Sequence, residues 1–191
     1  MKWTPEARAV ALRRTLPDVI ALDLDVLFCG INPGLYSAAM GWHFARPGNR
    51  FWPALAASGF TATQLHPSQQ AELLAARLGI TNLVARATVA ADELEADEIR
   101  AGRPRLERKV RRYRPLAVAV VGIGAYRIAF ERPRATFGRQ PEDLAGALLW
   151  VLPNTGGLNA HYQAAGFARA FADLRAAVEA RREGAARPGR Q

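Results

Sequence analysis

The residues most suited to chemistry lie in GINPGLYSAAMGWHFARPGNRFW, residues 30–52. Asn32 stands there in an Asn-Pro-Gly turn directly after an apolar run, and a turn former is the usual role of an Asn in that setting. A rigid turn after a buried strand would also hold the amide at the rim of a sheet. An amide in that place can hold a water through its oxygen while it donates a hydrogen bond to a substrate. Asn32 is therefore a candidate for positioning a water.

Two further features indicate what the substrate is. Phe44 lies in the same segment, in a loop bounded by Pro and Gly, where a core aromatic is less expected than in a strand. Its ring could serve as a stacking platform for a nucleobase. A second unusual loop, residues 153–162, follows an apolar run at 148–152, and loops after parallel strands emerge at the same edge of a sheet. We expect both loops to face one substrate.

The charge of the chain favours a nucleic acid as partner. The formal net charge is +9, and lysine occurs only at positions 2 and 109, so the positive charge is nearly all arginine. Arginine binds phosphate oxygens in pairs and stacks on bases. The basic tail from residue 181 could be a simple solvated end, but the remaining chain keeps a positive balance.

Several classes of protein are excluded by composition. The single cysteine, Cys29, leaves no set of thiolates for zinc or an iron-sulfur cluster, and the three histidines are spread along the chain, so we expect neither metal nor cofactor. Gly122 and Gly124 follow a strand, but Arg127 stands where a dinucleotide motif has its third glycine. No apolar run is long enough for a membrane span and the N-terminus does not read as a signal peptide, so we expect a cytoplasmic protein.

The apolar pattern predicts helices and strands in alternation. Strands are expected at 25–31, 80–84, 116–122 and 148–154, and helices at 4–16, 49–59, 67–79, 103–115, 124–131 and 162–183, with an acidic loop at 87–98. Unbroken apolar strands are typical of a parallel sheet that is covered on both faces. The sequence therefore predicts the α/β class, a three-layer αβα sandwich with a mostly parallel central sheet. We expect one domain over residues 1–182 and a basic flexible tail at 183–191.

Four stretches along the chain form an ordered set: GINPG at 30–34, HFARPGNRFW at 43–52, GITNLVARAT at 79–88 and NTGGLN at 154–159. Together they resemble the motifs of the mismatch-specific uracil and thymine DNA glycosylases, the Mug/TDG branch of the uracil-DNA glycosylase superfamily. The similarity runs from about residue 24 to about residue 178. The single cysteine agrees with it, because the iron-sulfur branches of the superfamily need a set of cysteines.

The resemblance implies hydrolysis of the bond between a flipped-out base and deoxyribose in double-stranded DNA, which leaves an abasic site. Asn32 would position the attacking water, and Phe44 would stack on the base. Main-chain groups of Ile31 and Phe44 would bind the edge of uracil, Ser37 would lie near its C5 atom, and Asn82 would lie near the pocket rim.

The resemblance also implies a wedge that enters the duplex and fills the gap left by the flipped nucleotide. This wedge would consist of Gly156, Gly157, Leu158 and Asn159.

Tyr36, next to Ser37, is bulkier than the residue that the family has there, which leaves the acceptance of thymine open.

Asp92 is a second catalytic candidate. It follows the third motif, which the family folds beside the pocket, and a carboxylate near the water would be a stronger general base than an amide. The alternative is that Asp92 is a solvated loop charge.

Taken together, these features predict a monomeric, nucleoid-associated DNA repair glycosylase that acts on uracil, chiefly in G:U mismatches, with G:T open. It would not cut the strand, because no lysine lies in the four motifs to form a Schiff base. Two alternatives stay open: a hydrolase of free nucleosides, and a non-catalytic module that binds mismatched or damaged DNA.

Overall fold

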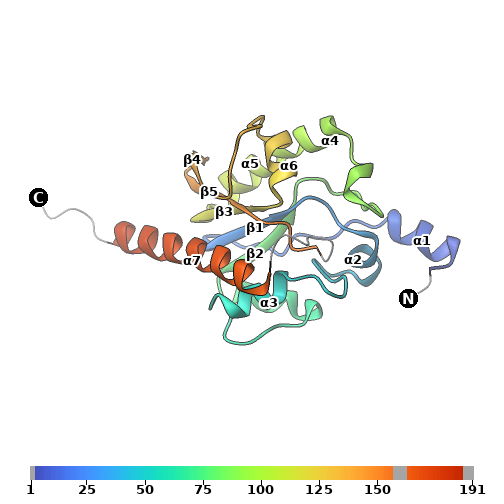
Figure 1. Cartoon of the computed structure of the whole chain (residues 1–191), viewed down its shortest axis with the longest axis horizontal. Helices are drawn as coiled ribbons and strands as arrows, with labels where there is room; N and C mark the ends of the chain where they lie inside the picture. Colours follow the sequence, from blue (N-terminus) through green and yellow to red (C-terminus); the bar gives the residue numbers. More distant parts are fainter. Residues whose placement is uncertain (1–2, 157–162, 187–191) are drawn as a thin grey trace, which may run out of the picture.

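The computed structural model describes residues 3–156 and 163–186 (Figure 1). Five strands form a sheet in the order β2-β1-β3-β5-β4. They are β1 (Val26–Gly30), β2 (Leu78–Asn82), β3 (Ala117–Val121), β4 (Gly138–Leu144) and β5 (Ala147–Leu152). β2, β1, β3 and β5 pair in parallel, and β4 pairs antiparallel with β5. The expected mostly parallel α/β sheet is confirmed.

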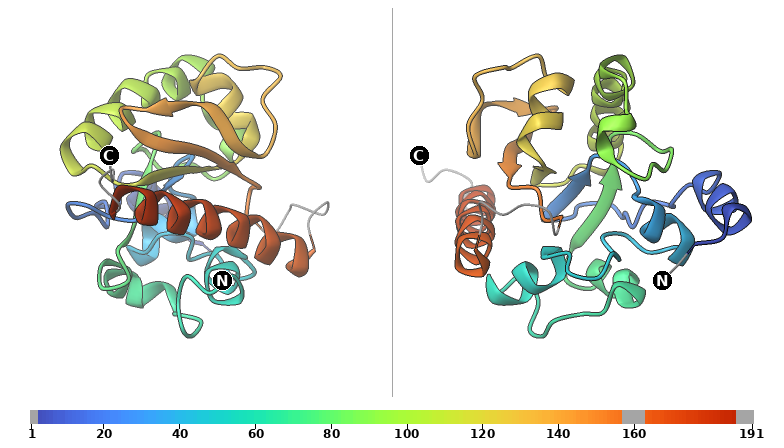
Figure 2. Two further views of the ribbon diagram at one scale, coloured as in Figure 1. Left: turned by 90° about the vertical axis from the view of Figure 1, so that its left-hand side faces the viewer. Right: turned by 45° about the vertical axis from the view of Figure 1, so that its right-hand side comes forward.

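Helices cover both faces of the sheet, as the views in Figures 1 and 2 show. α3 (Phe51–Ala57) and α7 (Ala164–Ala186) cover one face, and α4 (Ala96–Arg100), α5 (Gly102–Tyr113) and α6 (Ile123–Ala129) cover the other. α1 (Pro5–Leu12) packs against α2 (Leu35–Met40), which follows β1. Two 3-10 helices, η1 (Pro67–Leu74) and η2 (Ala91–Glu93), complete the set in the described residues.

The core consists of two clusters, one on each face of the sheet. In β1, Val26 and Phe28 belong to the cluster under α3 and α7, whereas Leu27 and Cys29 belong to the cluster under α5 and α6. Successive side chains of a strand point to opposite faces, so a strand covered on both faces must be apolar throughout. This burial explains why β1 reads as an unbroken apolar run.

The strand β4 was not predicted from the sequence. Its residues GRQPEDL carry one aliphatic side chain, Leu144, that is fully buried. β4 is an edge strand that pairs with β5 alone, so one edge and much of its surface face solvent and demand little apolar sequence.

The prediction of an α-helix at 67–79 is wrong both about the type of helix and about the residue at which it ends. The segment forms the 3-10 helix η1, and Gly79 lies inside β2 instead of ending a helix. A Cβ atom at Gly79 would lie 2.6 Å from the carbonyl oxygen of Val19 and 2.6 Å from Leu24. The glycine therefore permits the close approach of the chain that precedes β1.

Three segments expected to be irregular are more ordered than predicted. The stretch 30–52 contains α2, and the acidic loop at 87–98 contains η2 and the start of α4. The expected tail boundary at 182/183 falls inside α7, which continues to Ala186, and Arg182 there forms an ion pair with the buried Asp25 directly before β1. In the described part of the chain, no helix is long and apolar enough to span a membrane.

Candidate active site

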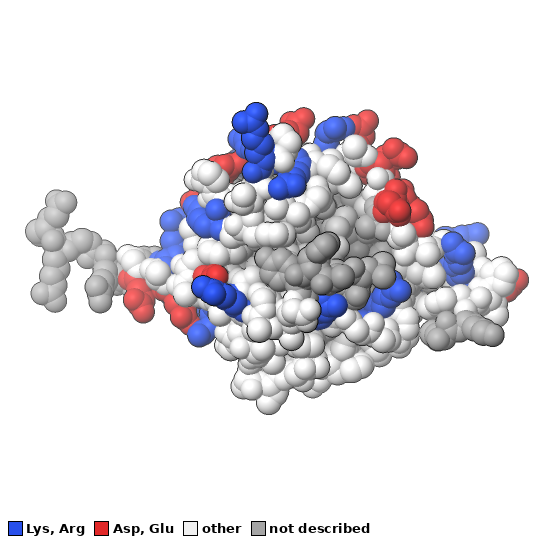
Figure 3. All heavy atoms as spheres, viewed as in Figure 1, with Lys and Arg blue, Asp and Glu red and all other residues white. Residues whose placement is uncertain are grey.

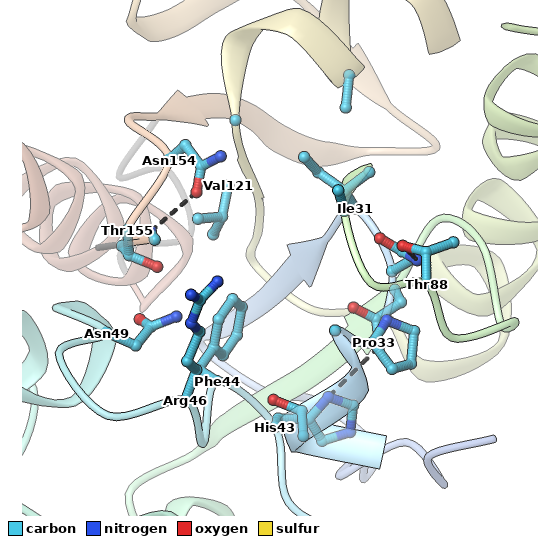
Figure 4. A pocket seen from close by; sticks show the side chains of 18 of the residues that line it. Ile31, Pro33, His43, Phe44, Arg46, Asn49, Thr88, Val121, Asn154 and Thr155 are labelled. Carbon is cyan, nitrogen blue, oxygen red and sulfur yellow. Dashed lines mark hydrogen bonds between the residues drawn. The ribbon is translucent and has the colours of Figure 1, made fainter. Parts of the chain in front are cut away.

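A pocket of about 880 Å³ opens at the carboxyl ends of four strands (Figure 4). Asn32 follows β1, Asn82 ends β2, Gly122 follows β3, and Asn154 follows β5, and all four line the pocket. Ligands of open α/β sheets bind at this edge. The two loops expected to face one substrate do meet here, as far as Gly156, the last described residue of the second loop.

The amide of Asn32 is held by its nitrogen. Nδ2 donates to the main-chain oxygen of Arg86 at 3.0 Å and to Oγ1 of Thr88 at 2.8 Å. A main-chain carbonyl oxygen can only accept, so the amide can take one orientation alone. Oδ1 then points away from both anchors, on a half-buried side chain that lines the pocket, with no protein partner among the described residues. It can accept a hydrogen bond from a water.

The segment that anchors Asn32 is itself fixed on two sides. The main chain of Thr88 accepts from Leu35 N–H at 2.8 Å and donates to the oxygen of Pro33 at 3.1 Å. The guanidinium of Arg86 binds both carboxylate oxygens of Glu98 in α4, at 2.6 and 2.7 Å. This hydrogen bonding lowers the pKa of Glu98 to about 2. Figure 4 shows Thr88 and Pro33 together at one side of the pocket.

Phe44 presents one face of its ring to the pocket. Its other face stacks on Phe51, with the ring centroids 4.1 Å apart and the planes 19° from parallel. Phe44 has a φ of 52°, in the left-handed region that is unfavourable for a bulky residue. Oγ of the buried Ser37 accepts from Ala45 N–H at 3.1 Å and so helps to hold this conformation. Ser37 lines the pocket and, through this hydrogen bond, also helps to position Phe44; its expected place near C5 of a base stays a prediction.

Asn82 lies against Gly30 at the end of β1. A Cβ atom at Gly30 would lie 2.5 Å from Oδ1 of Asn82 and 3.3 Å from Cζ of Phe44. Glycine is therefore needed here so that both side chains can meet over the end of the strand. Nδ2 of Asn82 lies 3.4 Å from Nδ1 of His43, which is buried.

Ile31 and Tyr36 have more specific surroundings than the sequence indicated. Ile31 lines the pocket, and its carbonyl oxygen accepts from Val84 N–H at 2.9 Å. Tyr36 does not narrow this pocket, because it lines a neighbouring pocket of about 450 Å³, where its ring meets Trp3 edge-on at 6.4 Å.

The structure does not bring Asp92 into the lining of the pocket. Val89 and Ala90 line it, whereas Asp92 lies on η2 with an exposed side chain. Its expected part in activating the water stays a prediction.

Only the first residue of the expected wedge can be placed. The N–H of Gly156 donates to Oδ1 of Asn154 at 2.9 Å, which forms a tight turn after β5. Thr155, between them, lines the pocket and has a buried Oγ1 with no hydrogen-bond partner among the described residues. The remaining expected wedge residues lie outside the described residues: Gly157, Leu158 and Asn159.

Charge is distributed unevenly around the hollow face in Figure 3, where acidic side chains gather at its upper right and Lys and Arg side chains lie below and to the right. The exposed Arg46 belongs to the pocket lining itself. Arg50 lies over the ring of Phe167 at 5.3 Å. No group of three or more His, Cys, Asp or Glu side chains in the described residues could hold a metal ion.

Three functional candidates were missed at the sequence level: Gly30, His43 and Thr88. Gly30 and His43 are the first residues of two of the four motif stretches, and Thr88 is the last residue of a third. Their place in these motifs was the sequence signal that could have identified them. Their roles depend on partners far away in the chain.

Known proteins resemble this chain in sequence and in fold. The family model described as the uracil DNA glycosylase superfamily matches residues 17–175. The solution structure of a candidate uracil DNA glycosylase from Methanosarcina acetivorans is similar in fold, with a TM-score of 0.55 and 17% identity over 85% of this chain and 98% of that chain. Members of the superfamily are DNA glycosylases, which are hydrolases that act on DNA. With this match over most of its length, the chain belongs to the uracil DNA glycosylase superfamily.

Proposed function

We propose that this protein is a monofunctional DNA glycosylase of the mismatch-specific branch, which hydrolyses the N-glycosidic bond of a flipped-out uracil in double-stranded DNA, chiefly opposite guanine. The observation that carries the proposal is the orientation of Asn32. Two anchors on its nitrogen leave Oδ1 as an acceptor in a pocket at the carboxyl edge of the sheet.

In the proposed reaction, Oδ1 of Asn32 accepts a hydrogen bond from a water and aims the water oxygen at C1′ of the deoxyribose. The new C1′–O bond forms as the C1′–N1 bond breaks, and the bonding electron pair leaves with the base. By analogy with other glycosyl transfers, the transition state resembles an oxocarbenium ion, so positioning can supply much of the rate. The water's excess proton passes to solvent, because an amide is not a base at neutral pH.

The base would stack on the free face of Phe44 and meet Asn82 at its edge. The stacked pair of Phe44 and Phe51 keeps this face in place, and Gly30 provides room for both contacts. Ser37 would lie beside the ring at C5. Because Tyr36 lines the neighbouring pocket, we expect Ser37 and its surroundings to determine whether thymine is accepted.

Duplex DNA is supported as the partner by the net charge of +9 and by Arg46 in the pocket lining. Flipping is least costly at a mismatch, which favours G:U over a matched pair. Schiff-base chemistry is not expected, because no lysine lines the pocket among the described residues, and Lys109 is bound by Asp18 at 2.6 Å.

The test is a single-turnover incubation with duplexes that carry U:G, T:G or U:A and with single-stranded U. We expect released uracil and an alkali-labile abasic site from U:G, with intact strands before alkali treatment. Asn32→Ala should lower the rate about a hundredfold or more, because a mispositioned nucleophile loses about that factor.

The other outcomes separate the alternatives. Release of base from free deoxyuridine but not from DNA would indicate a nucleoside hydrolase. Salt-sensitive binding without base release, unaffected by Asn32→Ala, would indicate a binding module.

For Asp92, we expect Asp92→Ala to slow U:G cleavage at least tenfold if a movement of η2 brings the carboxylate to the water. An unchanged rate would show that Asp92 does not activate the water, which would then be positioned by Asn32.

A further inference from the structure

A chain of hydrogen bonds runs behind the pocket from Pro17 to Asn82. His43 joins the two and is buried, with 2% of its surface exposed. Its Nε2 lies 2.9 Å from the main-chain oxygen of Pro17, and its Nδ1 lies 3.4 Å from Nδ2 of Asn82. Figure 4 shows His43 below Phe44 and Pro33, and His43 belongs to the lining of the pocket.

The partners in this chain determine where the protons lie. The oxygen of Pro17 can only accept, so Nε2 of His43 must carry a proton. In a neutral ring, Nδ1 then holds a lone pair, which must meet an N–H of the Asn82 amide. Nδ2 of Asn82 therefore faces His43, and Oδ1 lies over Gly30, where a Cβ atom would be 2.5 Å away.

His43 is held in its neutral form by its surroundings. Burial is the main cause that lowers its pKa from 6.5, and the nearby Lys109 lowers it further. The hydrogen bond to Pro17 and the charge of Asp18 act in the opposite direction. The main-chain groups of His43 meet only neutral side chains: its N–H donates to Gln70, and its oxygen accepts from Trp52.

The first hydrogen-bonding group of this series, the main-chain oxygen of Pro17, is fixed by a polar cluster on β2 and α5. The carboxylate of Asp18, next to Pro17, binds Nζ of Lys109 at 2.6 Å and Oγ1 of Thr81 at 2.7 Å. Lys109 also donates to Thr81 at 2.7 Å. Val19 exchanges two main-chain hydrogen bonds with Ile80, at 2.9 and 2.8 Å. The oxygen of Pro17 therefore cannot turn freely away from the ring.

We propose that His43 is a positioning residue that sets base selectivity, because it determines which end of the Asn82 amide faces the base. The proposal rests on the function proposed above. With Oδ1 toward the pocket, Asn82 accepts from the N3–H of uracil or thymine. A cytosine ring has a lone pair at N3, and the two acceptors repel.

The same arrangement makes selectivity depend on pH. When His43 takes up a second proton, Nδ1 becomes a donor and the Asn82 amide must turn to offer Oδ1 to it. Nδ2 then faces the pocket and can donate to the N3 atom of cytosine. Preference for uracil over cytosine should fall as the pH falls through the pKa of His43.

The first test is independent of catalysis. Nitrogen NMR of the imidazoles in the full chain, which has three histidines, reports the tautomer of each ring. We expect the Nε2–H tautomer for His43 at pH 7.5. An Nδ1–H tautomer or a charged ring at that pH would overturn the proposal, whatever the outcome of the cleavage assay.

The second test measures selectivity by binding. Duplexes that carry hydrolysis-resistant 2′-fluoro nucleosides of uracil or cytosine opposite guanine give affinity ratios between pH 5 and 8. We expect the wild-type ratio to drop about ten- to a hundredfold in acid, the range that one unpaired buried hydrogen-bonding group produces.

Two variants separate positioning from folding. His43→Asn can place an oxygen where Nδ1 stands, so it should keep the uracil preference at every pH. His43→Phe fills the ring's space without an acceptor and should lower the preference at every pH. The positioning role of His43 would be refuted by a wild-type uracil-to-cytosine affinity ratio that does not change with pH. A folded His43→Phe protein with wild-type selectivity would refute it as well. If His43→Phe does not fold, the affinity ratios of His43→Asn and the NMR result decide.

Discussion

At the scale of single residues, the site depends on amide groups whose two ends are not equivalent. Arg86 and Thr88 bind the nitrogen of Asn32, which leaves the oxygen for a water. In the inference above, His43 does the same for Asn82, with a base in place of the water. In both cases, the partner that binds the amide nitrogen determines that the amide oxygen is the end that stays available.

The anchor at Thr88 can be tested by removing one atom. Thr88→Val keeps the shape of the side chain and removes the acceptor of Asn32 Nδ2, while the oxygen of Arg86 remains. Because one hydrogen bond contributes about 1 kcal/mol, we expect a roughly five- to tenfold lower single-turnover rate with unchanged DNA affinity. Thr88→Ser, which keeps the hydroxyl, is the matched control. Equal rates for Thr88→Val and wild type would contradict the anchor role.

His43 should also make stability depend on pH. Its pKa is lowered in the folded protein by burial, so the unfolded chain takes up this proton more readily. The contribution is fully favourable above the unfolded pKa of about 6.5 and is lost as the pH falls below that value. We expect the melting temperature to fall between pH 7 and pH 5, and the slope to be smaller in His43→Asn.

Calorimetric scans at several pH values check this prediction. Glu98 cannot produce the same effect, because its pKa is lowered to about 2, so its contribution is lost only at more acidic pH. Identical slopes in wild type and His43→Asn would show that another group is responsible.

At the scale of elements, the end of β2 and the segment that follows it both contribute to the pocket. Asn82 ends β2 and lines the pocket, Thr88 in the following segment anchors Asn32, and α5 packs against this segment at Leu83. A Cβ atom at Gly102, the first residue of α5, would lie 2.8 Å from the main-chain oxygen of Leu83. Backbone cannot move aside as a flexible side chain can.

Gly102→Ala should therefore destabilise the protein. Overpacking typically costs about 1–3 kcal/mol, which corresponds to a melting temperature lower by roughly 3–10 °C in a protein of this size. We also expect weaker binding of uracil-containing DNA, because the displaced Leu83 directly follows Asn82. Gly184→Ala on α7, where a Cβ meets nothing within 4 Å, is the control and should be neutral or slightly stabilising. Equal melting temperatures for the two variants would contradict the packing argument.

At the scale of the whole molecule, two cores meet at a sheet that is covered on both faces. Asp25, directly before β1, is bound by Arg77 and by Arg182 of α7, so the last helix is tied to β1. Cys29 lies within β1 with no exposed surface, and burial raises the pKa of its thiol to about 12.

The single cysteine should thus report global unfolding. Alkylation needs an exposed thiolate, so at pH 8 we expect native protein to react only through the unfolded state. Gly102→Ala should accelerate labelling about five- to a hundredfold, in step with its loss of stability. The measurement is mass spectrometry after timed exposure to iodoacetamide. Rapid complete labelling of the native wild type would show that β1 opens locally.

The sequence by itself determined the layered architecture and most of the elements. Apolar runs such as Val26–Gly30, and the Thr4 cap with Pro5 at the start of α1, are local patterns that burial and capping impose on neighbouring residues. Asn32 was singled out because a turn after a buried strand lies at the sheet edge, and Phe44 because an aromatic in a Pro- and Gly-bounded loop is less expected in the core. Ser37 came only from the resemblance to the family motifs. The polar edge strand β4 carried too little apolar signal to be found.

Only the tertiary structure decided what each candidate presents to a substrate. The amide of Asn32 takes its orientation from Arg86, 54 positions along the chain, and that of Asn82 from His43, 39 positions away. The structure also placed Asp92 on an exposed turn and Tyr36 in a separate pocket. The physical reason is that burial patterns are local to a segment, whereas the direction of a hydrogen bond depends on a partner that only folding brings near.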